Sequence, residues 1–97
     1  PGPIYLAAAE GVCNAVANLV VNTNHAFYST RRPQETIQQM VGRLMALEAD
    51  PARGSQVLEI LTNHYNEAMN EGANRQTALR STFVAACLTP DVLGMGL

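Results

Sequence analysis

The chain has 97 residues, of which 47% are hydrophobic and 14% are charged, and its six basic residues are all Arg. This length predicts a single domain, residues 1–97, with one modest hydrophobic core. The net charge of −2 and the scattered arginines provide no basic surface, which argues against binding to nucleic acid or to an anionic membrane.

The first predicted helix runs from about Ile4 to Val21. Glu10, Asn14 and Asn18 recur every four residues and form a narrow polar stripe, while the rest of the helix is apolar. A helix in a small bundle needs one apolar stripe, so the outer side is expected to be covered either by this chain or by another one. In the second case the candidate interface residues are Tyr5, Ala9, Val12, Val16 and Val20.

The second predicted helix begins at Pro33 and continues to Leu47, with Ser29 or Thr30 as possible N-caps. Apolar residues follow at helical spacing through this segment. The sequence "EADP" then ends the helix.

Two further helices complete the predicted fold. Asp50 is expected to cap the third helix, which ends near Gly72, and Asn74 is expected to cap the fourth, which stops before Pro90. No stretch alternates apolar and polar residues over strand length. The pattern predicts an all-α protein, a small antiparallel four-helix bundle with an apolar C-terminal tail, "DVLGMGL". No apolar run reaches roughly 18 residues, so no membrane span is expected.

Cys13 and Cys87 are the two cysteines. They are compatible with one disulfide, and so with an oxidising compartment, or with two free thiols in the core. In an unstaggered antiparallel bundle their levels differ by roughly 12 Å, whereas a disulfide needs Cα atoms within about 7 Å. The pairing therefore requires staggered helices or a later start of the first helix.

His25 and His64 each follow Thr-Asn, but their predicted surroundings differ. His25 lies in the connection after the first helix, and His64 lies at the edge of the inner face of the third helix, near Glu67. The simpler interpretation is a boundary histidine hydrogen-bonded to a carboxylate. The alternative is a small bundle that binds haem or a metal ion through His64 and His25, for which the competing axial ligands are Met40, Met45 and Met69. Bundle metal sites generally take Glu-x-x-His from two helices, and here the reverse order occurs once, so no metal-ligand set is predicted.

The sequence predicts no catalytic residues. The cysteines have no cationic neighbour in sequence that would activate a thiolate, and the serines lie in no nucleophile-elbow pattern. A Gly-rich phosphate loop is absent. A small-molecule pocket between Tyr65, Phe83 and the Met residues is a further, non-catalytic alternative.

The segment "ALRSTFVAACLTPDVLGMGL", together with "YST" and the second predicted helix, resembles the C-terminal helical modules of some secreted or surface bacterial proteins. The resemblance covers roughly residues 28–97 and carries no functional residue with it. It implies an extracytoplasmic location, and it implies that the chain is one part of a longer precursor. The start at Pro1 rather than Met also predicts a processed product or an excised domain. The sequence therefore predicts a non-catalytic, extracytoplasmic helical module that binds a protein partner or forms a homo-oligomer.

Overall fold

The computed structural model describes residues 3–22, 28–89 and 92. Within these ranges the protein is all-α, as predicted, with the helices α1 (Pro3–Val20), α2 (Pro33–Gln39), the π-helical segment η1 (Met40–Leu44), α3 (Pro51–Asn70) and α4 (Arg75–Cys87). The predicted small helical bundle is thus confirmed. Of the predicted C-terminal tail, only Val92 lies among the described residues, and it packs against the core.

The ends of α3 and α4 follow from their capping residues. The Arg53 N–H donates to the Asp50 carboxylate (3.2 Å), and the Thr77 N–H donates to the Asn74 side chain (2.8 Å). Gly72 has a φ of +103°, a left-handed conformation that suits glycine after a helix. These three predicted signals are confirmed.

The start of α2 differs from the prediction. Its N-cap is Arg32, which makes no side-chain capping bond. The Ser29 hydroxyl accepts from the Arg31 N–H (3.1 Å), and the Thr36 hydroxyl donates to the Ser29 carbonyl (2.9 Å). Ser29 therefore shapes the connection before α2 and does not cap the helix.

The second predicted helix changes its winding halfway. The Met45 N–H donates to the Met40 carbonyl (2.9 Å), five residues back, as in a π-helix. The segment ends at Leu44, before the predicted end at Leu47, and Ala46 has a φ of +56° although it is not glycine. Met40 and Val41 at the start of η1, and Met45 directly after its end, are buried in the core.

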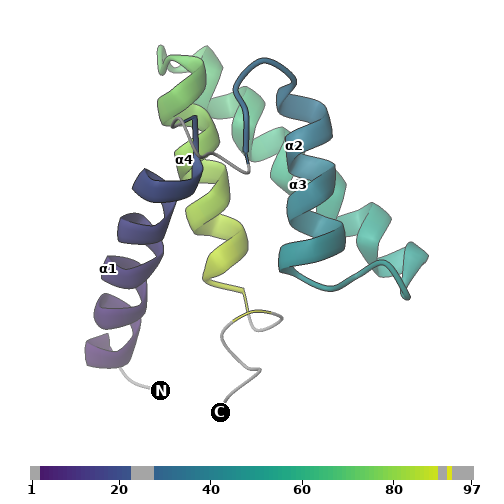
Figure 1. The fold of residues 1–97 in the computed structure, drawn as a ribbon, viewed down its shortest axis with the longest axis horizontal. Coiled ribbons are helices and arrows are strands. Elements are labelled where there is room, and N and C mark those ends of the chain that lie inside the picture. The colour runs from purple at the N-terminus through teal and green to yellow at the C-terminus, as the bar shows by residue number, and fades with distance from the viewer. Residues whose placement is uncertain (1–2, 23–27, 90–91, 93–97) are drawn as a thin grey trace.

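Helix α4 lies in the centre of the arrangement. It packs against α1 on one side and against α2, η1 and α3 on the other. Figure 1 shows α1 at one edge of the molecule, running antiparallel to α4, which separates it from α2 and α3. Helix α1 therefore presents one face to α4 and the opposite face to the outside.

The core lies around the inner face of α4. Its largest fully buried side chains come from several elements and include Ile37, Met40, Leu79, Val21, Thr82 and Cys13. The Tyr28 ring lies against Phe83, with 5.6 Å between the ring centroids. Burial raises the pKa of the Tyr28 hydroxyl, and the positive charge of Arg43 opposes part of this shift.

Cys13 and Cys87 form a disulfide between α1 and α4, with their Cα atoms 5.9 Å apart. Cys87 is the last residue of α4, whereas Cys13 lies in the middle of α1. Because the two helices are antiparallel, residues 3–12 of α1 extend beyond the end of α4. This stagger removes the offset that made the pairing doubtful from the sequence.

Candidate functional site

The five interface candidates on α1 differ in their surroundings. Val12 is 62% exposed, whereas Tyr5, Ala9, Val16 and Val20 are half-buried. Val16 and Val20 pack against the hydrophobic core. These four residues therefore border the side of α1 that faces α4, and Val12 belongs to the exposed side.

An apolar stripe follows the exposed side of α1, opposite Cys13. Its six members are all exposed and uncharged, and we call them the outer stripe: Ile4, Ala8, Gly11, Val12, Ala15 and Leu19. Ile4 is 87% exposed and Leu19 is 70% exposed. A Cβ placed on Gly11 would meet no atom within 4 Å, so the centre of the outer stripe is open.

Helix α1 is also long and apolar enough to cross a membrane, judged by length and composition alone. A helix that packs against other protein can have the same length and composition. Figure 1 shows that α1 lies along α4 over part of its length, and Cys13 binds it there covalently.

His64 on α3 is half-buried, and its Nε2 lies 2.8 Å from the hydroxyl oxygen of Ser81 on α4. The predicted carboxylate neighbour, Glu67, is exposed, and the hydroxyl is the partner that the structure gives to His64. A Ser–His pair at this distance is one part of a nucleophilic site. Ser81, however, lies inside α4, where backbone N–H groups are bonded within the helix and cannot form an oxyanion hole. The pair therefore serves as a contact between two helices.

The cofactor candidates are only partly among the described residues. His25 lies outside them. In the described ranges, no three His, Cys, Asp or Glu side chains are grouped so that they could hold a metal ion. Met40 and Met45 are buried in the core, and Met69 is half-buried. Haem or metal binding through His64 and His25 stays a prediction.

The residues considered for a small-molecule pocket also belong to the core. Tyr65 is 8% exposed and Phe83 is 2% exposed. Both side chains are in contact with other buried residues of the same cluster.

A polar cleft of about 380 Å³ lies between α1 and α4. Each helix contributes one stripe of side chains to its lining: Glu10, Asn14, Ala17 and Asn18 from α1, and Thr77, Arg80, Ser81 and Val84 from α4. The polar stripe of the first helix was visible in the sequence. The residues of α4 that face it were missed, because the spacing within one helix does not tell which helix lies beside it.

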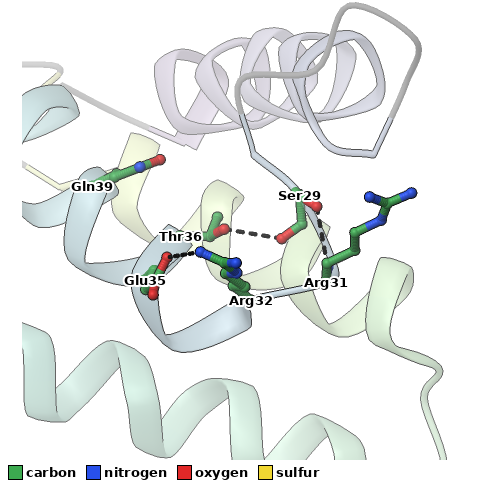
Figure 2. A pocket seen from close by; sticks show the side chains of 6 residues that line it. All are labelled: Ser29, Arg31, Arg32, Glu35, Thr36 and Gln39. Carbon is green, nitrogen blue, oxygen red and sulfur yellow. Dashed lines mark hydrogen bonds and ion pairs between the residues drawn. The ribbon is translucent and has the colours of Figure 1, made fainter.

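A second hollow, of about 310 Å³, lies at the start of α2 and is lined by Ser29, Arg31, Arg32, Glu35, Thr36 and Gln39. Figure 2 shows Arg32 and Glu35 turned toward one another, while Arg31 points away from them. The charged groups of Arg32 and Glu35 lie 3.6 Å apart and are both well exposed. Water therefore screens this pair.

Comparison with known protein families, with curated protein sequences and with solved structures gave no match.

Proposed function

We propose that this protein is a non-catalytic, extracytoplasmic helical module that self-assembles through the outer stripe of α1. The observation that carries the proposal is the uninterrupted row of exposed, uncharged side chains on the face of α1 opposite α4. Exposed apolar surface of this kind is characteristic of protein interfaces. Small residues in the middle of the row allow the backbones of two helices to approach closely.

A second copy of the chain is the partner that the outer stripe fits best. The side chains are arranged symmetrically by size about a centre between Gly11 and Val12. The small residues Ala8 and Ala15 flank this centre, and the large residues Ile4 and Leu19 lie at the two ends. In an antiparallel pair with a two-fold axis at this centre, Ile4 lies opposite Leu19 of the second copy, and Ala8 lies opposite Ala15 of the second copy. The same patch then contacts itself, as in the commonest type of dimer. No like charges meet in this arrangement.

A lipid bilayer fits the same helix less well. The disulfide at Cys13 holds α4 against α1, so the two helices would enter the membrane together. Glu10 and Arg80 would then lie at membrane depth, and each charged side chain there costs about 3 kcal/mol or more. A protein partner leaves both residues in the polar cleft.

The extracytoplasmic part of the proposal is supported by the disulfide. Such bonds persist in oxidising compartments and are rare in the cytosol. The resemblance of residues 28–97 to modules of secreted or surface bacterial proteins favours the same location.

The association is expected to be weak. The outer stripe runs from Ile4 to Leu19, about 22 Å along the helix axis. A single pair of helices of this length provides an interface at the low end of the size range of specific complexes. We therefore expect a monomer at low concentration and a dimer at high concentration.

Size-exclusion chromatography with light scattering, over a range of protein concentrations, tests the proposal. The wild-type protein is expected to shift toward a dimer as its concentration rises, and Ala8→Glu is expected to stay monomeric because it places a charge in the interface. Ala7→Glu is the matched control, since Ala7 is exposed on the same helix but lies beside the polar stripe. A wild-type protein that stays monomeric at every concentration contradicts the proposal.

The double variant Ala8→Glu/Ala15→Lys tests the antiparallel register. Opposite charges then face each other twice across the two-fold axis, so association is expected to recover relative to Ala8→Glu. In a parallel pair like charges would meet instead and association would stay lost. Failure to recover would contradict the antiparallel arrangement while leaving the role of the outer stripe intact.

A further inference from the structure

The start of α1 has an apolar side that α4 does not cover. Helix α4 ends at Cys87, which is bonded to Cys13, so residues 3–12 of α1 continue beyond this end (Figure 1). Leu6 lies about two turns before Cys13 and therefore points to the same side of α1. Leu6 is 54% exposed, whereas Cys13 is fully buried. Leu6 is thus a large apolar residue on the side of α1 that faces α4, at a level that α4 does not reach.

Two further residues widen this side of α1. Ala9 lies one turn before Cys13 on the same side, and Tyr5 lies next to Leu6 along its edge. Both residues are half-buried. We call Tyr5, Leu6 and Ala9 the inner patch, to distinguish it from the outer stripe on the opposite side of α1. The three side chains are uncharged, and Glu10, which follows Ala9, lines the polar cleft instead. A group that covers the inner patch is therefore expected to be apolar.

The chain itself supplies an apolar segment next to the inner patch. After α4 the chain stays against the body, because Leu88 and Val92 both pack against the hydrophobic core. Residues 93–97 lie outside the described residues, follow Val92 directly and have the sequence Leu-Gly-Met-Gly-Leu. In an extended segment successive side chains point to opposite sides, so the three large apolar residues share one face. Glycine at the two intervening positions leaves the other face without side chains.

The lengths of the segment and of the uncovered part of α1 agree. Residues 3–12 occupy about 15 Å of helix, and five extended residues span about 16 Å. The segment also begins close to the inner patch. Val92 follows shortly after Cys87, whose Cα atom lies 5.9 Å from that of Cys13. A segment that continues from Val92 can therefore lie along the whole inner patch while α4 keeps its described end.

We infer that residues 93–97 bind the inner patch as an extended strap, with Leu93, Met95 and Leu97 turned toward α1. Binding removes apolar side chains of both partners from water, and this burial is the driving force. The strap holds the start of α1 to the body through a second contact in addition to the disulfide. The inference is independent of the proposed self-assembly, because the outer stripe lies on the opposite side of α1 and stays free.

NMR spectroscopy of the oxidised, full-length protein, at a concentration where it is monomeric, tests this inference. Nuclear Overhauser effects are expected between the Met95 methyl group and the methyl groups of Leu6. A mixture of isotope-labelled and unlabelled protein distinguishes contacts within one chain from contacts between two copies. Absence of any contact between residues 93–97 and α1 would overturn the inference, and so would contacts that occur only between copies.

Two neighbouring substitutions test the extended arrangement of the strap. Met95→Ser removes an apolar side chain from the face that binds α1, so the amide hydrogens of residues 7–12 are expected to exchange at least about fivefold faster. Gly94→Ser is the matched control, because its side chain points away from α1 and exchange is expected to stay unchanged. Equal effects of the two substitutions, or no effect of Met95→Ser, would overturn the strap. Unchanged circular dichroism spectra show that both variants are folded.

Discussion

Helix α1 and the body formed by α2, η1, α3 and α4 are held in place by different means. The body is packed around fully buried side chains such as Ile37, Met40 and Leu79, and its elements contact one another. Helix α1 packs mainly against α4, and its buried residues are Cys13 and Ala17. The body depends on its hydrophobic core, whereas α1 depends on a narrow contact and one covalent bond. A helix held in this way keeps a whole face free for another molecule.

Removal of the disulfide is expected to have the largest effect on the difference in stability between α1 and the body. The double variant Cys13→Ala/Cys87→Ala removes a disulfide between residues that are 74 positions apart in the sequence. A disulfide that closes a loop of this length stabilises the folded state by about 4 kcal/mol in the chain-entropy model. We expect α1 to lose its amide protection before α3 does, measured by hydrogen exchange, and the free energy of unfolding in urea to fall. Equal loss of protection in α1 and α3 would show that the two regions unfold as one unit.

The next largest effect is expected when Leu is replaced by Ala once in the body and once in α1. Leu79→Ala removes a fully buried side chain from the body and is expected to cost about 3 kcal/mol of unfolding free energy. Leu19→Ala makes the same change on a side chain that is 70% exposed, and is expected to change stability by no more than about 0.5 kcal/mol. Leu19→Ala should instead weaken self-association in light scattering. A large loss of stability from Leu19→Ala would show that the outer side of α1 is covered within the monomer.

Substitutions at Gly11 and Gly54, which lie inside the α-helices α1 and α3, are expected to have the smallest effects, with opposite signs. A Cβ on Gly54 would lie 3.2 Å from the Leu47 carbonyl oxygen, which already accepts from the Asp50 N–H and has little room to move. Gly54→Ala is therefore expected to destabilise the protein by about 1 kcal/mol. Gly11→Ala meets no atom within 4 Å and is expected to stabilise α1 by about 1 kcal/mol through helix propensity. Thermal unfolding at low protein concentration measures the change in stability for both variants. If both variants were stabilised, or both destabilised, the inferred difference in packing would be contradicted.

Much of the fold could be predicted from local chemistry. Asp50, Asn74 and Gly72 mark helix ends because their short-range bonds and backbone preferences act within a few residues. The excess of apolar residues on α1 was also visible in its sequence. The sequence did not show which side of the helix is left uncovered by the rest of the chain. Val16 and Val20 share their apolar character with Val12, and only the position of α4 separates buried from exposed residues.

The remaining features depend on contacts between distant residues. The π-helical winding at Met40 was not predicted, because the spacing of apolar residues does not tell whether an N–H bonds four or five residues back. The disulfide was left open since the stagger between α1 and α4 is a tertiary property. Arg80 and Ser81 were not singled out in the sequence, because only the structure places them in the cleft beside α1 and places Ser81 against His64.

The disulfide also changes the topology of the chain. It closes the segment from Cys13 to Cys87 into a covalent ring that contains most of the protein. A protease that cuts once in any exposed link of this ring, such as the turn at Gly72, leaves two fragments that stay joined. Such a nicked protein would keep its mass under non-reducing conditions and separate into two pieces only after reduction. The ring thus keeps the two fragments of a protein that is cut once within it joined to each other.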